Sequence, residues 1–442
     1  MKPVLWTVAM NHRSHAPALL VLTALLSSCA GNWDPPSLVV PAKVRVLGIR
    51  AEPPAITMTA ETTMTVLAAG APDDATLCYA WAYCPYTWTK DGAYGCIDDE
   101  LLIPLGTDVT AQVGIADVFA SLSHAQAVFT KLGLQMPSTS SATSTDACKS
   151  ATTSGNPLAS ASLPDSYILF QVAEASLFGG KCPDPKTALA TACADRDKCL
   201  QGFKRLSVSA ATPNACAPFD AAKDKDCTKA DACDTQPVCG CDGRTYDTDC
   251  ARVAAKVSKR ADGACPDQNP PLTGVSVYWP LNDGAVEALG ALQGDTQTYV
   301  TDPKYTGLVA WPEDVTPVLH PGDSFEMLPI WPGAAKEYVG KATDPTAPPV
   351  YETLLFSWFT TGGSWAKDRS YDEYPENAFT APGLEVDEKP VTLTLWIVVR
   401  DGRNGTSWLR RHVTVTKNVG DPLDQRHPLC RTTPPLPGCP PN

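Results

Sequence analysis

Six cysteines between Cys227 and Cys265 are the residues whose spacing most clearly indicates chemistry. They follow the pattern C-x5-C-x5-C-x-C-x8-C-x14-C. Clustered cysteines either form disulfides or bind zinc. Zinc sites usually need paired C-x-x-C motifs or paired histidines, and this segment has neither, since no histidine lies between His124 and His320. A short segment with few apolar residues also needs cross-links to be stable. The spacing therefore predicts disulfides and no metal site.

The cysteine segment resembles a Kazal-type module, the fold of many serine-protease inhibitors and of follistatin-like modules. Four motifs carry the resemblance: PVCG at residues 237–240, DG-x-TY at residues 242–246, Cys250, and G-x-C at residues 263–265. The family's fifth cysteine is missing, with Val253 or Val257 in its place, and Cys241 is an additional one. The resemblance implies the following disulfides, the last as a substitute: Cys233–Cys250, Cys239–Cys265 and Cys227–Cys241.

The resemblance also implies an exposed inhibitor-like loop, Asp234, Thr235 and Gln236, with Thr235 as the primary specificity residue. Two departures weigh against inhibition. The loop has five residues between its cysteines rather than seven, and Thr248 stands where an asparagine usually braces it. An inhibitor must present its loop rigidly. We therefore expect the segment to be a disulfide-linked spacer or binding module, with serine-protease inhibition as the alternative.

The first 28 residues indicate a lipoprotein signal peptide. Lys2 and Arg13 supply positive charge, and a short apolar run ends in LSSCA, which resembles the bacterial lipobox. Cys29 is then the lipidated residue, and lipid the only membrane anchor, since no later apolar run is long enough to span a bilayer. Ala30 in place of aspartate implies the outer membrane, with the protein periplasmic or surface-exposed. The chain resembles bacterial lipoproteins of the myxobacterial type.

Composition agrees with export. Of 17 cysteines, lipidation of one leaves sixteen, an even number suited to disulfides in an oxidising compartment. Without Lys2 and Arg13, the chain has 33 basic and 48 acidic residues, a net charge of −15. This acidic balance argues against binding nucleic acid. The 41 prolines favour short strands over long helices.

Alternating apolar residues predict a mainly β fold. Residues 77–84 place Leu77, Tyr79, Trp81 and Tyr83 on one face, with Cys78 and Cys84 on the other. Cys84 is a plausible partner of Cys96. Residues 354–360, around Trp358, mirror this strand in the second half. We therefore expect a repeated sandwich unit that resembles immunoglobulin-like domains, which place a core tryptophan on a middle strand.

Strands are expected at residues 43–49, 62–68, 167–172, 206–208, 274–279, 325–331, 391–400 and 408–416, and a helix at 115–132. The predicted order is a signal peptide (1–28), a tether (29–42), an immunoglobulin-like sandwich with a helical and Ser/Thr-rich insertion (43–212), a Kazal-like module (213–268), a second sandwich (269–417) and a proline-rich tail (418–442).

No catalytic or nucleotide-binding motif is present, and His124, His320, His412 and His427 are dispersed. We expect a non-catalytic protein without a cofactor, which binds or spaces a protein partner such as a protease. A hydrolase with an unrecognised site is the remaining alternative. Trp365, Tyr371 and Tyr374 lie in a polar segment, where they could anchor a ligand or pack onto the sandwich.

Overall fold

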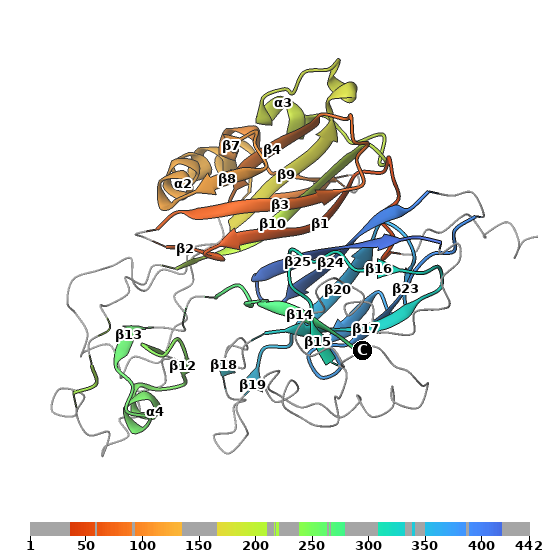
Figure 1. Cartoon of the computed structure of the whole chain (residues 1–442). Coiled ribbons are helices and arrows are strands. Elements are labelled where there is room, and N and C mark those ends of the chain that lie inside the picture. Colours follow the sequence, from red (N-terminus) through yellow and green to blue (C-terminus); the bar gives the residue numbers. More distant parts are fainter. Residues whose placement is uncertain are drawn as a thin grey trace, which may run out of the picture. The chain divides into compact units, whose positions relative to one another are not determined.

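The computed structural model describes residues 36–57, 60–90, 93–134, 166–209, 216, 218–220, 238–262, 265, 267–278, 308–331, 338–340, 350–385 and 389–417. All of these except Pro36 belong to one compact unit, Ser37–Asn442. The fold is mainly β, as the alternating apolar pattern predicts, with its long strands arranged as two β-sandwiches (Figure 1). Several disulfides accompany them.

The first sandwich consists of a three-stranded and a five-stranded sheet. The small sheet has the order β1 (Arg45–Glu52), β3 (Thr62–Ala69), β8 (Thr110–Val113). The large sheet has the order β2 (Ala55–Thr57), β10 (Cys199–Ser209), β9 (Ser166–Glu174), β4 (Leu77–Cys84), β7 (Ile103–Gly106). The edge strand β2 pairs parallel to β10, whereas the other pairs are antiparallel.

The second sandwich consists of two five-stranded sheets. One sheet has the order β15 (Leu308–Ala310), β14 (Gly274–Tyr278), β17 (Ser324–Ile330), β23 (Asn377–Thr380), β21 (Ser364–Trp365). The other has the order β16 (Val318–Leu319), β25 (Thr406–Val415), β24 (Val391–Arg400), β20 (Leu355–Thr360), β22 (Arg369–Tyr371). Here too a short edge strand, β16, runs parallel to the last long strand, β25. A separate pair is formed by β18 (Tyr338–Gly340) and β19 (Val350–Tyr351).

The predicted core tryptophans occupy equivalent places in the two sandwiches. Trp81 lies on β4, which follows β10 and β9 in its sheet, and Trp358 lies on β20, which likewise follows β25 and β24. Both residues are fully buried. Trp81 Nε1 donates to Asp108 O at 2.8 Å, and Trp358 Nε1 donates to Ser370 Oγ at 2.9 Å. Each indole thus satisfies its one polar group while its ring fills the core.

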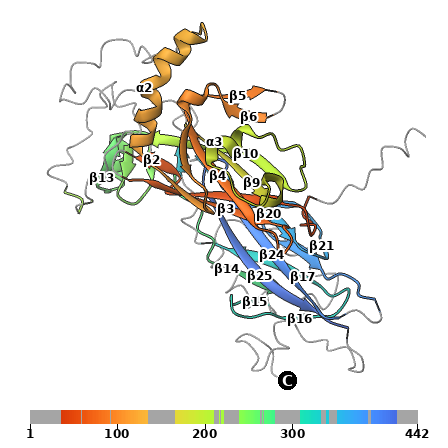
Figure 2. The ribbon, with the colours of Figure 1, turned by 90° about the horizontal axis from the view of Figure 1, so that it is seen from above.

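The insertion between β4 and β9 contains a strand pair and a helix. The strands are β5 (Thr87–Lys90) and β6 (Ala93–Cys96), followed by the short helix η1 (Asp99–Leu101). The predicted helix is α2 (Ile115–Lys131), the longest helix among the described residues (Figure 2), and Gly133 at φ +66° follows its end. Val118, Ala125 and Phe129 are buried, whereas Phe119 is exposed. Two further short helices follow β9: η3 (Ala175–Phe178) and α3 (Pro185–Ala190).

The strand β24 is buried on both faces. Its inward residues Leu395, Ile397 and Val399 belong to the core of the second sandwich. Its outward residues Trp396 and Val398 form a separate apolar cluster with Val39 and Leu47, which precede and belong to β1 of the first sandwich. Apolar surface on the outer face of one sandwich is therefore removed from water by the other.

Candidate functional site

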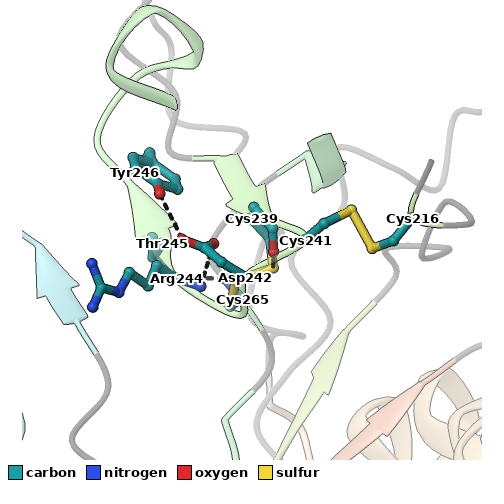
Figure 3. Close-up of a disulfide and its surroundings, with 9 residues drawn as sticks. Cys216, Cys239, Cys241, Asp242, Arg244, Thr245, Tyr246 and Cys265 are labelled. Carbon is teal, nitrogen blue, oxygen red and sulfur yellow. Dashed lines mark hydrogen bonds between the residues drawn. A yellow bond between two sulfur atoms is a disulfide. The ribbon is translucent and has the colours of Figure 1, made fainter. Parts of the chain in front are cut away.

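The cysteine-rich module is a small sheet with one helix. Its sheet has the order β12 (Thr245–Tyr246), β11 (Val238–Gly240), β13 (Lys259–Asp262), and its helix is α4 (Asp249–Ala254). Asp242 shapes the turn between β11 and β12: it accepts from Arg244 N at 3.1 Å and from the Tyr246 hydroxyl at 2.7 Å (Figure 3). Burial, followed by this contact with Asp242, raises the pKa of Tyr246 to about 12.

Disulfides link the module internally and to the segment before it. The expected bond between Cys239 and Cys265 is present. The expected Cys227–Cys241 bond is wrong, because Cys241 bonds Cys216 instead, with Cα atoms 5.6 Å apart (Figure 3). The inference failed because it sought a partner only within the segment of the family resemblance, whereas the chain before that segment returns to it. Cys250 is disulfide-bonded, and its expected partner Cys233 lies outside the described residues, as does Cys227.

The expected inhibitor-like loop, Asp234, Thr235 and Gln236, also lies outside the described residues, so it stays a prediction. Thr248, which the resemblance places beside that loop, has a defined role in the helix α4. Its Oγ1 accepts from Ala251 N at 3.1 Å and thereby caps the first turn of α4.

Among the described residues, the first sandwich contains three more disulfides. Cys84 bonds Cys96, as expected, and Cys78, on the same face of β4, bonds Cys182. The third joins Cys193 to Cys199 at the start of β10. The lipidation candidate, Cys29, lies outside the described residues. Within the described part of the chain, no helix has the length and apolar character needed to cross a membrane.

The three aromatic residues considered as ligand anchors do not lie together on the surface. Trp365 is 7% exposed and packs against Trp358 and Phe379, with ring centroids 4.8 and 5.1 Å away. It therefore belongs to the core and is not a ligand anchor. Tyr371 and Tyr374 are 54% and 50% exposed and remain available at the surface.

The structure also assembles a group of carboxylates that sequence analysis missed. Asp267 follows the cysteine-rich module, Glu352 lies between β19 and β20, and Asp401 begins the turn between β24 and β25. Each of the three residues is 3% exposed, and one carboxylate oxygen of each lies within 4.8 Å of those of the others. We refer to these residues as the carboxylate cluster.

Arg403 forms ion pairs with two members of the carboxylate cluster. Its Nη1 lies 2.9 Å from Glu352 Oε1, and its Nε lies 3.7 Å from Asp267 Oδ1. Lys204 of β10 also approaches, but its Nζ donates to Asn404 O and, at 3.3 Å, to Thr406 Oγ1 rather than to a carboxylate. Two cations therefore accompany three carboxylates among the described residues.

Burial and mutual repulsion raise the pKa values of the cluster. Burial, then the neighbouring Asp401, raises the pKa of Glu352 to about 7, against the opposing effect of Arg403. Burial, then Asp267, raises the pKa of Asp401 to about 6. Burial also raises the pKa of Asp267, opposed by Arg403 and by the amides of Asn404 and Gly405. The local cations thus compensate the buried negative charge only in part.

One sequence feature concerns this cluster, and it predicts a turn-forming role for Asp401 rather than a functional one. The Asp-Gly and Asn-Gly pairs at residues 401–402 and 404–405 predict a hairpin turn, and the structure has one there. Asp401 Oδ1 accepts from Arg403 N at 2.8 Å and from Gly405 N at 3.0 Å, a turn-stabilising role. Nothing local distinguishes Asp267 or Glu352 from surface acids.

Comparison with known proteins gives no family. No family model and no curated protein matches the chain. Two solved structures cover most of it: a bacterial ice-binding adhesin of 1.5 MDa (8% identity, 86% of this chain, 99% of that chain, TM-score 0.16) and the N-terminal domains of the bacteriophage RB49 outer capsid protein Hoc (9% identity, 85% and 100%, TM-score 0.16). Such low TM-scores carry no argument about fold or function.

Proposed function

We propose that this chain is a non-catalytic lipoprotein of the bacterial cell envelope, held at the outer membrane by lipid on Cys29. Its two immunoglobulin-like sandwiches, with a Kazal-like module between them in sequence, would bind a protein partner or hold it at a set distance from the membrane. The disulfides support export to an oxidising compartment. The Cys239–Cys265 bond, which the resemblance implies, supports the Kazal-like reading.

The observation that carries the spacing role is the apolar contact between the sandwiches. Trp396 and Val398 on the outer face of β24 pack with Leu47 of β1. Arg400 Nη2 also donates to Leu47 O at 2.6 Å, and Arg50 stacks over the Trp408 ring at 4.8 Å. Two sandwiches joined by buried apolar surface resist relative motion, whereas domains on a flexible linker move independently. A rigid pair is suited to presenting a partner at a fixed distance.

Calorimetry tests whether the two sandwiches behave as one unit. Val398 is fully buried in the contact, so Val398→Asp should separate the sandwiches and split one cooperative unfolding transition into two. Val318→Asp is the matched control, because Val318 is 40% exposed in the same sandwich and its change should leave a single transition. Two transitions already present in the unmodified chain would contradict the rigid-spacer role.

Two assays test the other parts of the proposal. Palmitate labelling should be lost in Cys29→Ser, and labelling that persists would remove the anchor. Titration against a panel of serine proteases separates a spacer from the inhibitor alternative. Cleavage after Thr235 without lasting inhibition would favour the spacer, whereas stable inhibition that Thr235→Ala abolishes would favour the inhibitor.

A further inference from the structure

We propose that the carboxylate cluster of Asp267, Glu352 and Asp401 is a binding site for a divalent cation of the Ca²⁺ class. The three side chains are each 3% exposed, and their oxygens converge within 4.8 Å. Ca²⁺ prefers carboxylate and carbonyl oxygens at about 2.3–2.6 Å, so ligands around one ion lie about 3–5 Å from one another. The spacing of the three oxygens fits this requirement.

Unsatisfied oxygens provide a second observation that points to a ligand. Both oxygens of Asp267 and Oδ2 of Asp401 are buried and make no hydrogen bond, although Asp267 Oδ1 forms an ion pair with Arg403 Nε at 3.7 Å. Buried polar atoms in folded proteins nearly always have a partner, and a buried charge without one is strongly unfavourable. A bound cation would give Asp267 Oδ2 and Asp401 Oδ2 the partner that the described residues do not supply.

The turn after β24 orients Asp401 for this role. Its Oδ1 accepts from the amides of Arg403 and Gly405, whereas its Oδ2 makes no hydrogen bond. A Cβ on Gly405 would lie 1.9 Å from Asp401 Oδ2 and 2.6 Å from Gln268 O. Glycine at this position therefore allows a carboxylate oxygen and a backbone carbonyl oxygen, both typical Ca²⁺ ligands, to approach the same place.

The charges of the cluster also favour a cation. Arg403 forms ion pairs with Glu352 and Asp267, but its side chain is 31% exposed and supplies one positive charge. Lys204 makes its hydrogen bonds to Asn404 and Thr406. Among the described residues, three carboxylates therefore meet two cations, and Arg403 would compete with a bound ion rather than belong to its ligands. Removal of Arg403 should consequently strengthen cation binding.

A cation here would join segments that are distant in sequence and would brace the contact between the sandwiches. Asn269, two residues after Asp267, donates from Nδ2 to Ala51 O at 2.6 Å and accepts from Thr406 N at 2.8 Å. A groove of about 370 Å³ lined by both sandwiches, Lys204 and Asp401 included, opens beside the turn and gives solvent a route to it. This inference is independent of the lipid anchor and of any protein partner.

Calorimetric titration of the full chain with CaCl₂ alone, after treatment with chelator, tests the site. We expect Ca²⁺ to bind with an affinity near the ~0.1–1 mM range of extracellular modules, to bind more tightly than Mg²⁺, and to raise the unfolding temperature. Asp267→Asn and Asp401→Asn should each weaken Ca²⁺ binding by about tenfold or more, since each replaces a charged oxygen ligand. Asn at 401 can still accept the two turn hydrogen bonds through Oδ1.

Two further variants separate the site from general effects of charge. Glu326→Gln removes another buried carboxylate of the same sandwich, which lies outside the cluster, and should leave Ca²⁺ affinity unchanged. Arg403→Gln removes a competing positive charge and should raise the Ca²⁺ affinity severalfold. The proposal is overturned if the unmodified chain shows no response to Ca²⁺, or if the double variant Asp267→Asn/Asp401→Asn binds like the unmodified chain. If the double variant does not fold, the Arg403→Gln variant decides: a Ca²⁺ affinity equal to or weaker than that of the unmodified chain also overturns the proposal.

Discussion

At the scale of single residues, Glu326 on β17 has a buried acid group whose charge is poorly compensated. It is 7% exposed, and its Oε2 makes no hydrogen bond. Burial, then the neighbouring Glu376, raises the pKa of Glu326 from 4.5 to about 7, and Lys367 opposes this shift. The folded protein therefore holds the Glu326 proton more tightly than the unfolded chain does.

This raised pKa predicts a loss of stability as pH rises. Below pH 4.5 both states are protonated and the group has no effect; between pH 4.5 and about 7 the unfolded chain ionises first, so unfolding becomes progressively more favourable. Glu326→Gln removes this loss and should stabilise the protein at pH 8 by at most about 3 kcal/mol, with little change at pH 4. Urea unfolding of the variant and of the unmodified chain at the two pH values measures this change in the unfolding free energy.

The exposed Glu313 provides the control for this effect. Glu313→Gln should change the unfolding free energy by no more than about 0.5 kcal/mol at either pH, as is usual for surface substitutions. A Glu326→Gln variant with the same stability gain at pH 4 as at pH 8 would show that shape and packing, rather than ionisation, cause the change.

At the scale of elements, the recurrence of large apolar residues at every second position predicted the strands best. The bounds of β4 and β24, which both show this recurrence, were predicted as the structure has them. β10 runs from Cys199 to Ser209, far beyond the predicted residues 206–208, because its pairing with β9 holds Gln201, Gly202 and Lys204 in extended backbone. The local amino-acid composition of β10 does not indicate this pairing.

Long-range assembly was the part that sequence could not provide. Cys84 and Cys96 are close in sequence, and their bond was predictable as a local bridge. The partner of Cys78 is 104 residues away, and Cys241 bonds a cysteine outside its own module. Asp267, Glu352 and Asp401 meet only because the sandwich closes. Carboxylates carry no periodic signal, so their convergence depends on tertiary structure alone.

The two disulfides of β4 should stabilise it to different extents. In the chain-entropy model, the loop closed by Cys78–Cys182 restricts the unfolded chain more than the short loop closed by Cys84–Cys96. We expect the double alanine variant of the first pair to lose about 5 kcal/mol and that of the second about 3 kcal/mol. Thermal or urea unfolding of the two double variants, compared under identical conditions, measures the difference, and the opposite order would contradict the entropic account.

At the scale of the whole molecule, the apolar outer face of β24 has a structural role that the predicted sandwich did not include. Alternation on β24 predicted an inward face, and Leu395, Ile397 and Val399 occupy it. Trp396 and Val398 on the other face are also buried, because β1 covers them. Gly48 of β1 lies at this contact: a Cβ there would be 3.2 Å from Val398 Cγ1. The absence of a side chain at Gly48 permits the two sandwiches to approach.

A double-mutant cycle between Gly48 and Val398 tests this contact in solution. Gly48→Ala forces a methyl group against Val398 and should destabilise the protein, whereas in the Val398→Ala background the missing methyls leave room for it. The two changes should therefore couple favourably, by about 0.5–1 kcal/mol in the unfolding free energy. The matched cycle uses Val275→Ala, a valine equally buried on β14 in the core of the same sandwich, and should be additive with Gly48→Ala. Additivity in both cycles would mean that β1 and β24 do not touch in solution, and the rigid-spacer role would lose its structural basis.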